Sequence, residues 1–255
     1  MEQKIKAILW DYDGTLVNST IKNMAVTIDV LRHFDPEVDQ HVPEILTDLE
    51  KYQEANYQCK NWRELYARYF GLSPEQTDEA GTLWTPCQLN NRTIPPLMAE
   101  GLREAILFLG ETLRIPMGIC SQNSSENIRQ MLDHYGIGGC FQAVVGHDDI
   151  PLDRQKPDAV GFMRCLELLG LDGAERGGLY VYIGDHGEDV VFGRNAQREL
   201  AAGGQEARVS CIAAMYGQDQ YTDVDAWGSQ PDYRAKTTEG LLEYLKSLSE
   251  GGIVL

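Results

Sequence analysis

The sequence lacks several features that would assign a protein to a membrane, to secretion or to nucleic acid. It has no run of about 18 apolar residues and no cationic N-terminal segment that leads into a long apolar run. Basic residues are also few, since 22 Lys and Arg stand against 39 Asp and Glu and give a formal net charge of −17. Nucleic-acid binders gather Lys and Arg into a stripe, and this sequence has no such stripe. We therefore expect a soluble, cytoplasmic protein that binds neither membranes nor nucleic acid.

The cysteines lie far apart in the sequence and lack the spacing of a metal site. The six cysteines include no CxxC pair and no His/Cys cluster with the spacing of a zinc site. Reduced, mostly buried thiols are the simplest interpretation. The composition, 43% hydrophobic and 24% charged, is typical of a globular protein, and 255 residues suffice for one large domain or for one domain with an insertion.

Short apolar, β-branched runs alternate with longer segments of helical periodicity. The runs cover residues 6–13, 115–122, 142–148, 178–185 and 208–217, and the helical segments cover 97–113, 124–135, 157–170, 188–203 and 237–249. This alternation predicts an α/β fold with a doubly wound, mostly parallel, Rossmann-like sheet. Ser124 and Ser125 are the expected N-caps of the second helical segment, and Gly136 is its expected C-terminal stop. The third segment is expected to start at Pro157 and to stop at Gly170.

Residues 19–94 break this alternation. They show no strong strand pattern and contain the helix-compatible segments 22–34, 43–56 and 61–70. Pro95 and Pro96 then stop a helix and favour extended chain. We predict a core domain made of residues 1–18 and 95–255, with an inserted α-helical domain of residues 19–94.

Polar residues end or follow four of the five apolar runs. In chain order they are Asp11 and Asp13, then Ser121, Gln122 and Asn123, then Lys156, and finally Asp185 and Asp189. In parallel α/β sheets, ligands collect beyond the carboxyl ends of the strands. These residues are therefore expected to share one site.

The expected site combines carboxylates with an anion-binding set. Asp11 and Asp13 point the same way in an extended chain, and two adjacent carboxylates need a cation or a proton. With two more aspartates nearby, a hard cation such as Mg²⁺ would relieve the repulsion. Lys156, the Ser121 hydroxyl and the N–H groups of the following helix suit a phosphate group. Metal, phosphate donors and a nucleophilic carboxylate together indicate phosphoryl transfer.

Taken singly, each of these residues has a purely structural explanation. An Asp before Gly is common in turns, Ser121 suits a helix cap, and a Lys before Pro suits a solvated surface. Asp185 and Asp189 suit the first turn of a helix, where negative charge is favourable. Their order at successive strand ends favours a common site.

The sequence resembles the haloacid dehalogenase-like (HAD) hydrolase superfamily. Its four motifs are matched in order by "DYDGTL" (11–16), "ICSQN" (119–123), "KPD" (156–158) and "GDHGED" (184–189). The resemblance implies that Asp11 is a nucleophile that forms an aspartyl-phosphate, and that Asp13 is the general acid and base. It also implies the ligands of the phosphoryl group and of Mg²⁺. The phosphate ligands would be Ser121, Gln122 and Lys156, and the metal ligands Asp11, Asp13 through its backbone carbonyl, Asp185 and Asp189.

The aspartate at position 13 favours phosphate chemistry over carbon–halogen cleavage within this superfamily. The insertion at 19–94 resembles the helical cap between the first and second motifs of phosphoglycolate phosphatase-like members, which closes over the site. The resemblance thus implies a Mg²⁺-dependent phosphatase that acts on a small phosphorylated metabolite, a phosphomonoester. A phosphomutase of the β-phosphoglucomutase type and a non-catalytic binding or regulatory protein are the alternatives.

Two features fall outside this interpretation. His186 stands where small residues are common in the superfamily, and it is a substrate contact, a pH-sensitive neighbour of the metal or an incidental exposed residue. The polar segment 217–236 either lines the site entrance or packs over the sheet edge, and we favour packing. The sequence does not identify the substrate, the cap residues that contact it or the oligomeric state.

Overall fold

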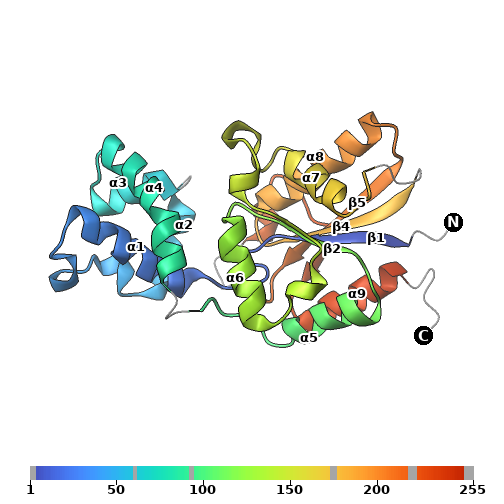
Figure 1. Cartoon of the computed structure of the whole chain (residues 1–255), viewed down its shortest axis with the longest axis horizontal. Coiled ribbons are helices and arrows are strands. Elements are labelled where there is room, and N and C mark those ends of the chain that lie inside the picture. The colour runs from blue at the N-terminus through green and yellow to red at the C-terminus, as the bar shows by residue number, and fades with distance from the viewer. Residues whose placement is uncertain (1–3, 60–61, 92–94, 173–176, 218–222, 250–255) are drawn as a thin grey trace. The chain divides into compact units, whose positions relative to one another are not determined.

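The computed structural model of the chain describes residues 4–59, 62–91, 95–172, 177–217 and 223–249. Contacts divide the chain into two compact units, one formed by Met1–Asn18 with Met98–Leu255 and the other by Ser19–Leu97. The larger unit carries the sheet and the smaller unit is helical (Figure 1). Among the described residues, no helix has the length and apolar character that crossing a membrane requires.

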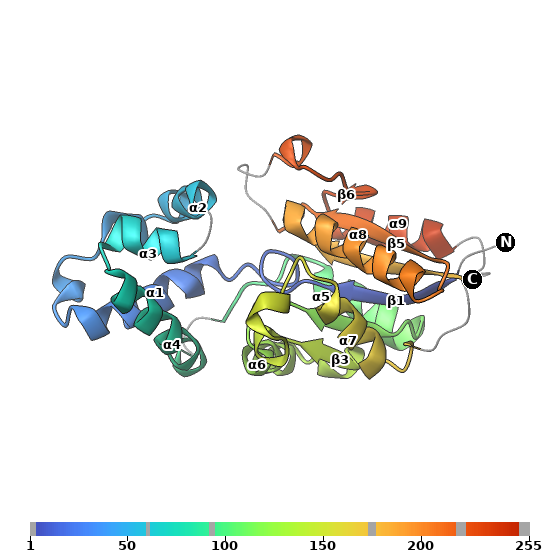
Figure 2. The same cartoon turned by 90° about the horizontal axis from the view of Figure 1, so that it is seen from above.

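A six-stranded, fully parallel sheet forms the centre of the larger unit. The strands are β1 (Ile5–Trp10), β2 (Met117–Cys120), β3 (Ala143–Val145), β4 (Gly178–Gly184), β5 (Ala207–Ala214) and β6 (Tyr233–Ala235). Their order is β3-β2-β1-β4-β5-β6, and the labelled strands β6, β5, β1 and β3 follow one another in this direction in Figure 2. The strand order reverses at β1, and ligands of doubly wound sheets bind at such a reversal. The predicted α/β, Rossmann-like fold is confirmed.

Alternate residues of the strands enter two separate hydrophobic cores. Along β1, Ile8 and Trp10 enter one core, and Ala7 and Leu9 enter the other. Figure 1 shows α7 and α8 on one side of the sheet and α5 and α9 on the other. The helices over the first core are α5 (Leu102–Leu107), continued by a π-helix (Phe108–Thr112), α6 (Ser125–Tyr135) and α9 (Thr238–Ser249), and those over the second are α7 (Val160–Leu168) and α8 (Gly187–Ala202). Because helices cover both faces, most strand residues are apolar; the exceptions include Lys6 in β1, and Arg208 and Ser210 in β5.

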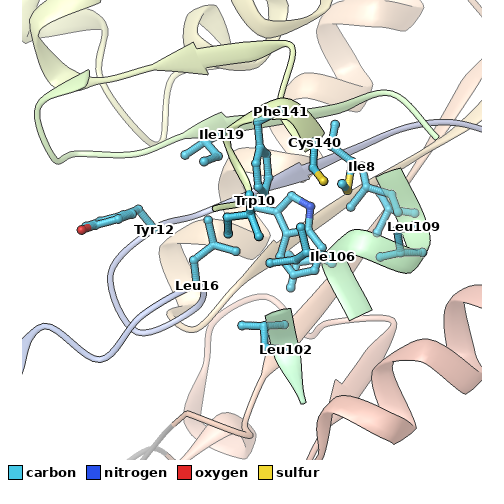
Figure 3. Close-up of a cluster of buried hydrophobic side chains, with 14 of the residues drawn as sticks. Ile8, Trp10, Tyr12, Leu16, Leu102, Ile106, Leu109, Ile119, Cys140 and Phe141 are labelled. Atoms are coloured by element: carbon cyan, nitrogen blue, oxygen red, sulfur yellow. The ribbon is translucent and has the colours of Figure 1, made fainter. Parts of the chain in front are cut away.

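Trp10 lies in the middle of the first core, fully buried at the end of β1. Figure 3 shows its indole among side chains from the helical side, Ile106 and Leu109, and from the sheet side, Ile8. This packing fixes the last residue of β1, and the chain continues directly into Asp11. The hydrophobic core therefore positions the first residue of the candidate site.

The predicted helix ends are correct for α6, where the cap is Ser124, and for the end of α7, where Gly170 at φ +68° follows the C-cap residue; the predicted start of α7 is wrong. Ser124 caps α6 by accepting a hydrogen bond from the Asn127 N–H at 3.3 Å, and Gly136 ends the helix at φ +63°. In contrast, α7 begins at Val160 and not at Pro157. The carboxylate of Asp158 accepts the Val160 N–H at 3.0 Å, so the first turn starts after this aspartate.

The polar segment that follows β5 packs against the larger unit, as favoured from the sequence. Within it, Trp227 packs against the core cluster that contains Tyr182 and Phe192, and Tyr233 stacks on Tyr244 with ring centroids 4.0 Å apart. The strand β6 in this segment was not predicted. It has three residues, which are too few for a period-two pattern, and it pairs with β5. Residues 218–222 of the segment lie outside the described residues.

The smaller unit consists of helices α1 (Thr20–Phe34), α2 (Leu49–Gln58), α3 (Trp62–Phe70) and α4 (Pro74–Asn90). Its own buried side chains come from several helices and include Val30, Leu31, Tyr52 and Leu65. Helix α4 was not among the predicted helical segments because Pro86 interrupts its pattern. Its start is nevertheless strongly encoded, since Ser73 forms a capping box with Gln76. That this unit serves as a cap domain stays a prediction.

Candidate active site

The carboxyl ends of neighbouring strands bring the predicted polar residues together. Asp11 follows β1 directly, and its N–H donates to the carbonyl of Ile183 in β4 at 2.8 Å. Ser121 follows β2, and its N–H donates to the carbonyl of Val145 in β3 at 3.0 Å. The hydrogen-bond ladder thus extends one residue beyond each strand. Sheet pairing therefore fixes the backbone of both residues.

A buried ammonium group lies at the centre of the site. The Nζ of Lys156 is 2.6 Å from Oδ1 of Asp11 and 2.8 Å from Oδ1 of Asp189. The Lys156 side chain is 5% exposed, and the two carboxylates are 11% and 7% exposed. The rings of Tyr182 and Phe192 lie 5.1 and 5.4 Å from Nζ and add weak cation–π attraction. Lys156 is therefore not the solvated surface residue that it would be in isolation.

The site holds more negative charge than Lys156 neutralises. Oxygens of Asp11, Asp185 and Asp189 lie within 4.8 Å of one another. Burial raises the pKa of Asp11 to about 7, against the opposing attraction of Lys156 and with further repulsion from Asp189. Burial, followed by repulsion from the same two aspartates, raises the pKa of Asp185 well above its usual value.

For Lys156, the surroundings favour the charged form. Burial alone lowers the pKa of Lys156, but attraction by Asp11 and Asp189 outweighs burial and raises the pKa above the usual value of a lysine. Lys156 therefore stays charged, and one positive charge faces three carboxylates. With all three carboxylates ionised, Lys156 and the three aspartates carry a net negative charge, which a further positive charge would offset.

This donor set fits a hard divalent cation. Three converging carboxylates supply the oxygen ligands that Mg²⁺ prefers, and burial together with mutual repulsion raises the pKa of Asp11 and of Asp185. Asp11, Asp185 and Asp189 are the side chains that could hold the ion. The carboxylate of Asp13 contacts Asn123, and its expected metal contact through the backbone carbonyl stays a prediction.

Two glycines allow the backbone to approach these carboxylates closely. Gly14 has φ +76°, and a Cβ there would lie 2.1 Å from Oδ2 of Asp185. At Gly184 a Cβ would lie 2.3 Å from Cγ of Asp189. Both distances are far below van der Waals contact, so a side chain at either position would displace a carboxylate of the site.

Ser121 and Gln122 follow β2 beside this centre. The buried Ser121 accepts the Asn123 N–H through Oγ at 3.2 Å, which leaves its own O–H free to donate. Ser124, and not Ser121, caps α6, so the capping explanation of Ser121 is wrong. The exposed Gln122 donates to the backbone carbonyl of Lys156 at 3.5 Å. Phosphate binding by Ser121 and Gln122 stays a prediction.

The first turn of α8 sets the direction of Asp189. Its Oδ2 accepts the His186 N–H at 3.0 Å, while its Oδ1 faces Lys156. Asp189 thus has both of the roles that the sequence left open. It takes part in the capping box at the start of α8, and its carboxylate pairs with Lys156. His186 is exposed and accepts the Glu188 N–H through Nδ1 at 3.3 Å, which makes it the N-cap of α8.

Asn123 is a site residue to which the sequence assigned no role. Its Nδ2 donates to Oδ2 of Asp13 at 2.8 Å, across 110 positions of sequence. The only signal in the sequence was its place at the end of the same polar run as Ser121 and Gln122.

Known proteins resemble this chain in sequence and in fold. The family model of the haloacid dehalogenase-like hydrolases matches residues 5–197. The chain is 30% identical over 206 residues to a pyrophosphatase PpaX of Listeria monocytogenes, spanning 80% of this chain and 84% of that protein. It is 25% identical over 239 residues to a phosphoglycolate phosphatase of Chromobacterium violaceum, spanning 88% and 90%. A solved haloacid dehalogenase-like hydrolase of Streptococcus pneumoniae has the same fold, with a TM-score of 0.67, 20% identity and coverage of 94% of this chain and 98% of that one.

Proposed function

This chain belongs to the haloacid dehalogenase-like hydrolase family, as its four motifs indicated, and from that premise we propose a Mg²⁺-dependent phosphatase that hydrolyses a small phosphomonoester through an aspartyl-phosphate. The observation that carries the proposal is the buried contact of Lys156 with Asp11, 2.6 Å between Nζ and Oδ1. A carboxylate held beside a fixed ammonium at the reversal point of a parallel sheet suits attack on a phosphoryl group.

Asp11 is the nucleophile in this mechanism. Its carboxylate forms a bond to phosphorus while the bond from phosphorus to the leaving oxygen breaks, and Asp13 gives its proton to that oxygen. Asp13 then accepts a proton from water as the water attacks phosphorus, which releases phosphate and restores Asp11. Throughout, Lys156 offsets the negative charge of the nucleophile and of the phosphoryl oxygens.

The remaining groups bind and orient the phosphoryl group. The Ser121 O–H is free to donate to a phosphoryl oxygen, and the first N–H groups of α6 lie just beyond it. Gln122 is the third proposed phosphate ligand. Mg²⁺ held by Asp11, Asp185 and Asp189 would neutralise carboxylate and phosphoryl charge and orient the substrate.

The substrate is a small phosphorylated metabolite under this proposal, and the helical unit, predicted from the sequence as residues 19–94, serves as a cap domain. Relatives carry the names pyrophosphatase and phosphoglycolate phosphatase. Pyrophosphate and phosphoglycolate are therefore the first compounds to test, although pyrophosphate is an anhydride and not a monoester. Transfer to a sugar, as in a phosphomutase, has no observation in its favour.

The test is a turnover panel with Mg²⁺, covering phosphoglycolate, pyrophosphate, sugar phosphates and nucleotides. We expect phosphate release from at least one compound, and loss of that release in Asp11→Asn with the circular dichroism spectrum unchanged. Asp133→Asn, on the exposed face of α6, is the matched control and should keep full activity. A folded protein that releases no phosphate from any of these compounds contradicts the proposal, and product analysis separates phosphatase from mutase.

A further inference from the structure

The side chain of Asn123 contacts the carboxylate that the proposed mechanism uses twice. Its Nδ2 donates to Oδ2 of Asp13 at 2.8 Å, and the residue is 9% exposed. Asp13 itself lies in the turn after β1, where the chain leaves the sheet. A carboxylate in a turn has several side-chain rotamers, and the amide of Asn123 selects one of them.

The orientation of this amide is fixed from the opposite side. The oxygen Oδ1 of Asn123 accepts the N–H of Ser124 at 2.8 Å and Nδ2 of Asn127 at 3.1 Å. Both partners are donors at these contacts, so the amide oxygen must face them and the NH₂ group must face Asp13. A flipped amide would leave a buried N–H group against two donors.

The backbone of Asn123 is fixed as well. Its N–H donates to Oγ of Ser121 at 3.2 Å, and its carbonyl accepts the N–H of His147 at 2.9 Å. Asn127, in turn, lies with Nδ2 3.4 Å from the hydroxyl of Tyr12, which precedes Asp13 in the chain. Figure 3 shows the Tyr12 ring pointing away from the Trp10 indole within the same buried cluster. The contact to Asp13 thus has a rigid support on both sides.

We infer that Asn123 is a positioning residue, which holds Asp13 in the orientation that delivers its proton to the leaving oxygen; this inference rests on the proposed function. An amide NH₂ only donates, so Oδ2 of Asp13 is an acceptor wherever this contact is kept. The proton that moves to the leaving oxygen is therefore carried by Oδ1. Asn123 acts through Asp13 and does not itself touch the reacting atoms.

The two ends of the Asn123 amide can be separated by mutation. Oδ1 supports the start of α6, whereas Nδ2 faces Asp13. Asn123→Asp keeps the shape and an oxygen toward Ser124, and it replaces the donor toward Asp13 with a second oxygen. Asn123→Ala removes both ends. If Asn123→Ala does not fold, Asn123→Asp still tests the contact.

The test compares substrates with different leaving groups in the full-length protein with Mg²⁺. p-Nitrophenyl phosphate has a good leaving group and gains little from protonation, whereas phosphoglycolate has an alkoxide leaving group that needs the proton. General-acid catalysis is worth about 100-fold or more, so we expect both Asn123 variants to lose about 10-fold or more kcat/KM on phosphoglycolate beyond any loss on p-nitrophenyl phosphate. If the panel identifies a different alkyl phosphate, it replaces phosphoglycolate.

Two controls distinguish positioning from general damage. In Ser125→Ala, a bond at the same helix start is lost, from Ser125 Oγ to Oδ2 of Asp148 at 2.9 Å, and any loss should be equal on both substrates. In an Asp13→Asn background, Asn123→Ala should cause no further leaving-group-dependent loss. Equal losses on both substrates, or additive losses in the double variant, would overturn the inference while wild-type turnover stands. If wild-type protein hydrolyses neither these substrates nor any in the panel, the proposed function fails first.

Discussion

Gly14→Ala tests how tightly the turn after β1 packs on Asp185. The added Cβ would lie 2.1 Å from Oδ2 and 2.5 Å from Cγ, whereas ordinary contact begins at 3.4 Å. The carboxylate or the turn must therefore move by more than 1 Å. In addition, Gly14 has φ +76°, a conformation that costs an L-residue roughly 1–2 kcal/mol. Relieving the overlap inside a packed site adds about 1–3 kcal/mol.

The matched control is Gly204→Ala. Gly204 has φ +79°, and nothing lies within 4 Å of a Cβ built there. This variant should lose only the conformational part, roughly 1–2 kcal/mol. The difference between the two alanine variants therefore isolates the overlap with Asp185, and we expect it to be about 1–3 kcal/mol.

The assay is urea unfolding of both variants, together with Mg²⁺ titration by calorimetry. Gly14→Ala should also bind Mg²⁺ more weakly, because the shift displaces one of the three proposed ligands. Gly204→Ala should bind Mg²⁺ as the wild type does. Equal destabilisation of the two variants, with unchanged Mg²⁺ binding in both, would refute the packing argument and the assignment of Asp185 to the metal.

Three further predictions concern charge in the larger unit. Lys156→Met removes the ammonium between Asp11 and Asp189. We expect turnover to fall by about 100-fold or more, and the free energy of unfolding to fall by about 3–5 kcal/mol because breaking a buried ion pair leaves uncompensated charge. Steady-state kinetics measures the first loss and urea unfolding the second. Without metal, the folded-state pKa of Asp11, about 7, exceeds the usual value of roughly 4, so its contribution to stability is complete below pH 4 and is lost as the pH rises toward 7. Urea unfolding in EDTA should show this decline, and Asp11→Asn should remove it. Burial raises the pKa of Asp148, but hydrogen bonds from the N–H and Oγ of Ser125 outweigh burial and lower it. The contribution of Asp148 to the free energy of unfolding, below about 1 kcal/mol at this exposed position, is therefore present above pH 4 and lost in acid. Asp148→Asn should abolish this part of the pH dependence in urea unfolding.

The sequence predicts the elements of the larger unit well because burial there is periodic and local. Strands covered on both faces read as apolar runs, and four of the five runs end in or are followed by a polar residue of the site. The position of Asp11 and Ser121 at adjacent strand ends follows from that pattern and from the parallel sheet. Elements without such a pattern were missed, namely β6 with three residues and α4 with Pro86 in its interior.

Contacts between side chains distant in sequence could not be read in the same way. Whether Lys156 lies in solvent or between two carboxylates depends on the path of the loop after β3, which periodicity does not report. The bond from Asn123 to Asp13 depends on the register of β1 against β2 and on the direction of one amide. Asp189 had two competing explanations in the sequence, and the structure satisfies both with different oxygens.

If Asp11 is the nucleophile, it carries the phosphoryl group during turnover, and this aspartyl-phosphate can be trapped. The enzyme would be mixed with Mg²⁺ and its best substrate, quenched within the first turnover and treated with borohydride, which reduces an acyl phosphate to an alcohol. Peptide mass spectrometry then locates the reduced residue. We expect reduction at residue 11 that depends on substrate and is absent in Asp11→Asn. Rapid turnover with an unmodified residue 11, or with reduction at another carboxylate, would contradict this expectation.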